Sequence, residues 1–146
     1  MSKGIKLISC SPEETISIGY EFAKDLKAGD IVGLFGNLGS GKTQFVKGVC
    51  GFFNVKETVN SPTYIIVNEY SGFYKNSENI IRINHFDLYR LKNISELKEI
   101  GLESYVNDNS VCIIEWPEFA DQFLKGNIMK VYLHYGENEN ERIIEY

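Results

Sequence analysis

The chain has 146 residues, is poor in arginine and carries more acidic than basic side chains. Its only arginines are Arg82, Arg90 and Arg142, and its net charge is −5. Such a surface is poorly suited to gripping a nucleic-acid backbone, which proteins hold mainly through lysine and arginine. If nucleic acid is involved in the function, we expect a partner to hold most of it.

The chain is also poor in cysteine and lacks a long apolar run. Cys10, Cys50 and Cys112 are odd in number, lie far apart and form no C-x-x-C motif. This favours buried free thiols in a reducing cytosol over a disulfide or metal framework. No apolar run approaches the ~20 residues that span a membrane. We therefore expect a cytoplasmic protein without a membrane partner, folded as one domain over residues 1–146.

The most informative stretch is the glycine-rich segment 36–43, which fits the phosphate-binding pattern G-x-x-x-x-G-K-[ST]. The apolar run Ile31–Phe35 precedes it with the length of a buried strand, and residues 44–50 follow with helical spacing. Glycines let backbone N–H groups approach phosphate oxygens, and a helix N-terminus favours the same anion. A glycine-rich turn without a ligand is the alternative. The residues predicted to bind a nucleotide here are Gly36, Asn37, Leu38, Gly39, Ser40, Gly41, Lys42 and Thr43.

Within this segment, two side chains carry the chemistry. Lys42 is expected to reach the β- and γ-phosphates, and the Thr43 hydroxyl is expected to bind Mg²⁺. Phosphate-loop enzymes also need an acid at a strand end to hold the metal or its waters. Both Asp87 and Glu115 end strand-like segments. Glu115 is the better metal acid because its strand is uninterrupted and apolar, which leaves Asp87 to orient water or assist the metal.

Further residues have two interpretations each. Ser11 is predicted to cap a helix in a capping box with Glu14, or to contact the nucleotide base or sugar. His85 shares a strand face with Asp87 and is expected either to hydrogen-bond this acid or to pack. Trp116 is expected either in the core or as a wall near the nucleotide.

The remaining pattern predicts an α/β fold of the P-loop NTPase type, with three layers and a mixed, partly antiparallel sheet. Beyond the segments above, we expect strands over 5–8, 63–70, 79–86, 111–115, 128–135 and 141–146, helices over 11–27 and 91–105, and a short helix after Trp116. Residues 71–78 are predicted to form a turn, and Ser95 is a possible N-cap.

Several motifs then coincide in order: Gly36–Thr43, Ser61–Tyr64, His85–Leu91 and Ile114–Pro117. In this order the chain resembles the TsaE (YjeE) family, the P-loop ATPase of bacterial tRNA threonylcarbamoyladenosine synthesis. The resemblance covers nearly the whole chain. Asn37 stands where the family usually has Asp, and Gln44 replaces a common threonine, but neither change removes a phosphate or metal group.

The resemblance implies an ATP- and Mg²⁺-binding ATPase that is weak alone. It implies a role beside the TsaB–TsaD pair, which transfers the threonylcarbamoyl group to adenosine 37 of tRNA, so that tRNA would be met only through that pair. By position, Lys42, Asp87 and Glu115 would be catalytic, Thr43 and Glu115 would hold Mg²⁺, and Ser61–Thr63 would resemble a switch that senses the γ-phosphate.

Two other functions compete. A small-metabolite kinase usually needs a basic lid that excludes water, and three arginines offer little material for one. A nucleotide-sensing regulatory switch selective for GTP would carry an N-K-x-D element, which this sequence lacks.

Overall fold

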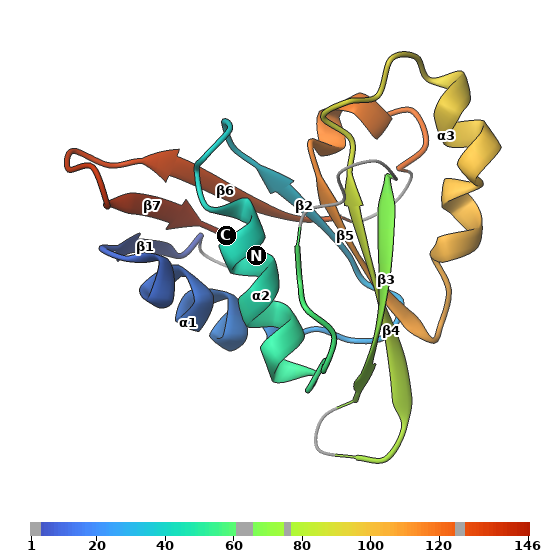
Figure 1. Ribbon diagram of the computed structural model, residues 1–146, viewed down its shortest axis with the longest axis horizontal. Helices are drawn as coiled ribbons and strands as arrows, with labels where there is room; N and C mark the ends of the chain where they lie inside the picture. Colours follow the sequence, from blue (N-terminus) through green and yellow to red (C-terminus); the bar gives the residue numbers. More distant parts are fainter. Residues whose placement is uncertain (1–3, 61–65, 75–76, 125–127) are drawn as a thin grey trace.

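The computed structural model describes residues 4–60, 66–74, 77–124 and 128–146. The segment Ser61–Thr63, which the resemblance implies to be a switch, lies outside them. The strands are β1 (Lys6–Ser9), β2 (Ile31–Phe35), β3 (Val67–Phe73), β4 (Ile80–Asp87), β5 (Ser110–Glu115), β6 (Met129–Tyr135) and β7 (Arg142–Glu145). The helices are α1 (Pro12–Ala23), α2 (Lys42–Phe52) and α3 (Ser95–Ile100), with 3₁₀ helices η1 (Leu102–Tyr105) and η2 (Pro117–Ala120) (Figure 1).

All of these strands belong to one mixed sheet in the order β1-β7-β6-β2-β5-β4-β3. Strand β2 is parallel to both of its neighbours, β5 and β6, and β4 is parallel to β5. The other three pairings, β3 with β4, β6 with β7 and β1 with β7, are antiparallel. The predicted α/β class with a mixed, partly antiparallel sheet is confirmed.

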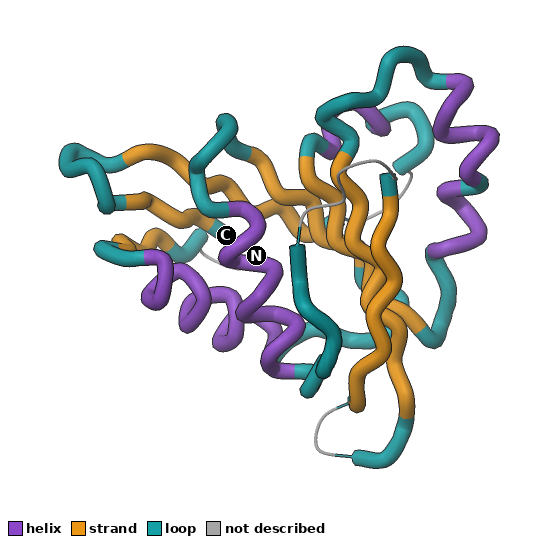
Figure 2. The backbone as a smooth tube through the Cα atoms, in the orientation of Figure 1, coloured by secondary structure: helices purple, strands orange, loops and turns teal. Residues whose placement is uncertain are grey.

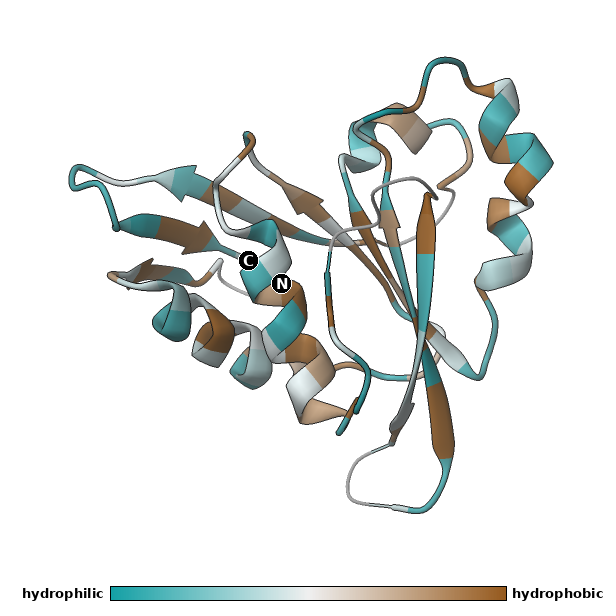
Figure 3. Ribbon diagram, in the orientation of Figure 1, coloured by the Kyte–Doolittle hydropathy of each residue, from teal (hydrophilic) through white to brown (hydrophobic). Residues whose placement is uncertain are grey.

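The sheet separates two hydrophobic clusters, which gives the three layers. Strand β5 is buried along its whole length, and its alternating side chains serve both clusters. Val111 and Ile113 join the cluster that contains α1 and α2, whereas Cys112 and Ile114 join the cluster that contains α3, η1 and η2. Figure 2 shows α1 and α2 lying side by side on one side of the sheet. In Figure 3, brown segments run through the central strands while the helices carry mixed teal and brown turns.

Two glycines bring α1 unusually close to α2. A Cβ built on Gly48 would lie 2.0 Å from the Ile16 carbonyl oxygen, and one on Gly19 would lie 2.2 Å from the Phe45 carbonyl oxygen. Only glycine permits this approach of the two backbones. The close crossing places the start of α1 beside the start of α2, which matters for the site described below.

The start of α1 follows the predicted cap, with one difference. The Ser11 hydroxyl accepts a hydrogen bond from the Glu14 N–H at 3.1 Å, and Pro12 is the first helical residue. The Glu14 carboxylate, however, accepts from the N–H of Cys10 at 2.7 Å instead of from that of Ser11. The reciprocal bond is thus displaced by one residue, and the helix ends at Ala23, earlier than predicted.

Two element predictions were wrong. Residues 71–73, predicted as turn, pair with β4, and a Cβ on Gly72 would lie 2.5 Å from the Phe53 carbonyl oxygen. The glycine therefore belongs to a strand that packs closely against the end of α2. The helix predicted over 91–105 is divided by Gly101, whose left-handed φ of 73° ends α3. Ser95 is the first residue of α3 and not its N-cap.

The thiols are free, as predicted, but they are not all buried. Cys50 and Cys112 are buried, whereas Cys10 is exposed. Burial raises the pKa of the Cys50 thiol to about 12 and that of the Cys112 thiol to about 11. Among the described residues, no helix combines the length and hydropathy that a membrane span requires.

Candidate nucleotide-binding site

The parallel centre of the sheet brings the predicted residues to one edge. Strands β2, β4 and β5 run in the same direction, so their carboxyl ends meet. In the register, Asp87 lies opposite Glu115, and Glu115 lies opposite Leu34, the residue before the end of β2. Both acids therefore end their strands beside the loop that leaves β2.

That loop, residues 36–43, has the conformation that an anion site requires. Gly39 and Gly41 have left-handed φ values of 78° and 102°, which other residues rarely adopt. Gly41 precedes α2, and no side chain caps the first turn of this 11-residue helix. The N-terminal N–H groups of α2 and its dipole are therefore arranged as an anion site.

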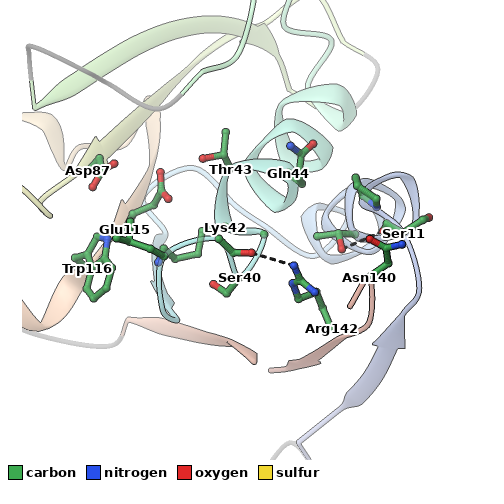
Figure 4. A pocket seen from close by; sticks show the side chains of 15 residues that line it. Ser11, Ser40, Lys42, Thr43, Gln44, Asp87, Glu115, Trp116, Asn140 and Arg142 are labelled. Atoms are coloured by element: carbon green, nitrogen blue, oxygen red, sulfur yellow. Dashed lines mark hydrogen bonds between the residues drawn. The ribbon is translucent and has the colours of Figure 1, made fainter. Parts of the chain in front are cut away.

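A cavity of about 390 Å³ opens at this edge. Figure 4 shows that the acids and Trp116 form one end, Lys42 and Thr43 lie in the middle, and Ser11, Asn140 and Arg142 form the other end. Its lining residues are Ser11, Pro12, Thr15, Leu38, Gly39, Ser40, Gly41, Lys42, Thr43, Gln44, Asp87, Glu115, Trp116, Asn140 and Arg142. Of the predicted residues, Gly36 and Asn37 do not line it and lie instead along a neighbouring hollow.

Gly36 and Asn37 contribute through their carbonyl groups. The Lys42 ammonium donates to the Gly36 carbonyl oxygen and, at 3.2 Å, to that of Asn37. It also lies 4.1 Å from the centre of the Trp116 ring, within cation–π range. Burial lowers the pKa of Lys42, while the charges of Glu115, Asp87 and Glu118 oppose that shift. The loop thus keeps a poorly solvated cation at the cavity wall.

Glu115 is held by a histidine from the next strand. His85 Nε2 lies 2.6 Å from Glu115 Oε2, and both side chains are almost completely buried. His85 therefore contacts Glu115 and not Asp87, the partner considered from the sequence. The strand-face argument placed His85 correctly, but the neighbouring parallel strand brings the second acid within reach. One carboxylate oxygen of Glu115 is fixed by this contact.

Asp87 is the more accessible of the two acids. It is partly buried, and its Oδ1 accepts the Tyr89 N–H at 3.1 Å. Burial raises its pKa, and the nearby Glu115 adds to that shift, whereas the bond from Tyr89 opposes it. Two acids at one wall with unequal surroundings are suited to unequal roles.

Trp116 is partly buried: it forms a wall of the cavity and also packs against the hydrophobic cluster that contains α3, η1 and η2. Its backbone lies in the left-handed region with φ of 60°, unusual for a residue with a side chain. The indole lies between this cavity and the neighbouring hollow, and it stacks on Phe119 with 6.0 Å between ring centres. Both interpretations of Trp116 therefore hold in part, because the side chain packs against the core and also lines the cavity.

The far end of the cavity holds residues that the sequence did not indicate. Asn140 and Arg142 come from the connection and the strand that follow β6. The site residues that the family resemblance implies end at Glu115, before this C-terminal part. Strand β6 is parallel to β2, so the β6–β7 hairpin returns to the same edge as the loop. An isolated arginine after a polar turn gives no sequence signal of that return.

Comparison with known proteins identifies the family to which the chain belongs. The model of the family "Threonylcarbamoyl adenosine biosynthesis protein TsaE" matches residues 9–144. The chain belongs to the TsaE family. A TsaE protein of Bacillus subtilis is 33% identical over 140 residues, covering 95% of this chain and 84% of the relative. One from Rickettsia felis is 37% identical over 138 residues, covering 94% and 76%.

A solved member of this fold agrees with the arrangement described here. The crystal structure of Bacillus subtilis YdiB matches with a TM-score of 0.77 and 28% sequence identity, over 99% of this chain and 85% of that one. The resemblance to TsaE and the P-loop-like α/β fold are thus confirmed, and TsaE is named for threonylcarbamoyl adenosine biosynthesis.

Proposed function

We propose that this TsaE chain is a Mg²⁺-dependent ATPase that takes part in forming threonylcarbamoyladenosine in tRNA beside the TsaB–TsaD pair. The names of its relatives place them in tRNA threonylcarbamoyladenosine biosynthesis. The observation that carries the proposal is the meeting of Lys42, Glu115 and Asp87 in one cavity with the uncapped start of α2. A structural turn that binds nothing would need neither a buried cation nor two facing acids.

ATP would bind with its phosphates along residues 39–43. The N–H groups of the loop and of the first turn of α2 would contact the β-phosphate. Lys42 lines the cavity while its ammonium is held by the loop, and its charge would shift to the β- and γ-phosphates. The γ-phosphate would then lie toward Asp87 and Glu115, and the nucleoside toward Ser11.

The donor set fits Mg²⁺ that arrives with the nucleotide. Thr43 offers a hydroxyl and Glu115 a carboxylate, the hard oxygen ligands that this ion prefers. Across the described residues, no group of three or more His, Cys, Asp and Glu side chains is arranged to hold a metal. Phosphate oxygens and water would supply the remaining ligands. Bound there, Mg²⁺ would neutralise charge on the β- and γ-phosphates.

Asp87 is suited to orient the attacking water. One of its carboxylate oxygens, Oδ1, accepts a hydrogen bond from the Tyr89 N–H. Asp87 lines the cavity at the end where the γ-phosphate would lie. The water oxygen would bond to the γ-phosphorus, the bond to the β–γ bridging oxygen would break, and ADP and phosphate would leave. Asp87 would accept a hydrogen bond from the water, and the water's proton would pass to phosphate or solvent.

The test is an ATPase assay with and without the TsaB–TsaD pair and tRNA. We expect slow hydrolysis by the chain alone and faster hydrolysis with the pair. Formation of modified tRNA should depend on this chain. No stimulation, together with equal tRNA modification in its absence, would refute the proposal.

Two additions to this assay separate the competing functions. Competition of GTP against ATP tests for a guanine-selective switch, and we expect ATP to bind more tightly. A screen of small acceptors for ATP-dependent phosphorylation tests for a metabolite kinase. Transfer to an acceptor in preference to water would support the kinase instead.

A further inference from the structure

Beside the far end of the cavity, hydrogen bonds join two parts of the chain that are about a hundred residues apart. Tyr135 ends β6 and Arg142 begins β7, and the two residues lie directly opposite each other in the hairpin. The Tyr135 hydroxyl donates to the Leu38 carbonyl oxygen. Arg142 Nη2 donates to the Gly39 carbonyl oxygen at 3.2 Å, the contact drawn toward the loop in Figure 4.

These two side chains are themselves fixed. Arg142 Nη1 donates to the carbonyl oxygens of Glu139 and Glu141, at 2.7 and 2.9 Å. The guanidinium also lies 4.9 Å from the centre of the Tyr135 ring. A planar guanidinium with fixed donors, stacked on a ring, gives directed hydrogen bonds that lysine does not reproduce. The hairpin thus presents two oriented donors to adjacent carbonyl groups of the loop.

The loop needs such support at this point because Gly39 is flexible. Glycine adopts positive and negative φ with similar ease, so the peptides on either side of Gly39 rotate at little cost. A rotated peptide would turn a carbonyl oxygen toward the anion, where its partial negative charge opposes phosphate binding. In a trans peptide the C=O and the following N–H point in opposite directions. Holding the Leu38 carbonyl therefore also fixes the Gly39 N–H.

We propose that Tyr135 and Arg142 are positioning residues of the phosphate-binding loop, which hold the Leu38 and Gly39 carbonyl groups away from the bound triphosphate. This inference rests on the proposed nucleotide site and names a support that the loop motif does not contain. The support acts on the polyphosphate, whatever base the nucleotide carries.

The experiment compares the affinities of ATP, ADP and inorganic tripolyphosphate for the full chain, measured by calorimetry. Tyr135→Phe removes one donor and keeps the ring. We expect this variant to lower the affinity for each of the three ligands by about threefold to tenfold, the effect of one hydrogen bond. Arg142→Lys keeps the charge and should weaken binding by a similar factor. Arg142→Gln also removes the charge and should weaken it by about thirtyfold.

The control is Tyr132→Phe. Tyr132 lies on the same strand but on the opposite face, stacked against Phe35 with 4.9 Å between ring centres. The Tyr132→Phe variant should leave the affinities for ATP, ADP and tripolyphosphate unchanged. Thermal unfolding of every variant shows whether the hairpin still folds. With ATP saturating, the turnover number of Tyr135→Phe should stay near wild type while its KM rises.

The outcomes separate the possible errors. If Arg142→Lys binds tripolyphosphate as wild type does, Arg142 acts only as a charge, and the inference is overturned. If the Arg142 variants lose nucleotide but not tripolyphosphate, Arg142 contacts the base or sugar, and it is likewise overturned. If the wild-type chain binds none of the three ligands, the proposed nucleotide function fails first, and the positioning role fails with it.

Discussion

The two ends of the cavity are built in opposite ways. At the acid end, Glu115 is 3% exposed, the neighbouring Lys42 is 6% exposed, and Asp87 and Glu115 extend from the central parallel strands. At the open end, Asn140 is exposed and Arg142 is partly exposed, and both come from a hairpin at the side of the sheet. The acid end is poorly solvated, so charges interact strongly there. The open end is solvated, so substitutions there should cost less.

The two ends of the cavity are therefore suited to different roles. Chemistry requires groups fixed to within a fraction of an ångström, which paired strands provide. Recognition of a nucleoside tolerates more movement, which a helix start and a hairpin provide. Variants at the acid end should therefore change binding or turnover greatly, and variants at the open end should change affinity modestly. The following predictions test that order.

The largest effect is expected from Lys42→Ala. The change removes the cation that faces Asp87 and Glu115, and a buried charge of this kind contributes several kcal/mol to binding. ATP binding should weaken at least 100-fold, to the point of loss in calorimetry. Lys47→Ala, on the same helix but outside the cavity lining, is the matched control. Normal ATP binding by Lys42→Ala would show that the site is wrongly assigned.

Glu115→Gln should come next, with an effect on turnover more than on binding. The amide keeps the size of the side chain but loses the charge offered to Mg²⁺, so hydrolysis should fall by roughly 100-fold to 1,000-fold. The measurement is single-turnover hydrolysis over a range of Mg²⁺ concentrations. Glu103→Gln, which changes an exposed carboxylate in η1 outside the cavity lining, serves as the control. Unchanged hydrolysis in Glu115→Gln would transfer the metal role to Asp87.

Asp87→Asn should lower hydrolysis by about 100-fold, as expected for a group that orients water, yet stabilise the fold. Because burial raises the pKa of Asp87, the native chain holds its proton more tightly than the unfolded chain does. The free energy of unfolding therefore falls as the pH rises from the carboxyl pKa of the unfolded chain through the raised pKa of Asp87 in the folded chain. Asn should give a modest gain at pH 7 that disappears at low pH, measured by urea unfolding at both pH values. A loss of stability at pH 7 would contradict this account.

The same contrast explains what the sequence could predict. The loop, Asp87 and Glu115 were found because a strand followed by glycines, and strands that end in acids, are local patterns. Parallel pairing of β2, β4 and β5 then fixes where they meet. The strands of the mixed sheet could also be predicted, because most are apolar runs bounded by turn residues in the sequence.

The open end could not be found in this way. Arg142 reaches the loop only because β6 pairs with β2 and not with an outer strand, and that choice depends on packing across the whole sheet. Likewise, the local sequence around Gly72 predicts a turn, and only its packing against the end of α2 explains why a strand glycine lies there. The contact of His85 with Glu115 depends on the register of two strands. Each of these results from tertiary structure and has no local pattern.

The smallest effect, and the sharpest test of the open end, is expected from Ser11→Ala. Its hydroxyl caps α1 by accepting the Glu14 N–H, and loss of such a cap costs about 1 kcal/mol of unfolding free energy. Ser11 also lines the cavity, and its hydroxyl hydrogen is suited to donate to the nucleoside. ATP affinity should therefore fall about threefold while tripolyphosphate affinity stays unchanged. Ser11→Asp, which retains the cap, should recover stability but not ATP affinity. Equal ATP binding by Ser11→Ala and wild type would leave Ser11 as a helix cap alone, and recognition of the nucleoside would then fall to Asn140.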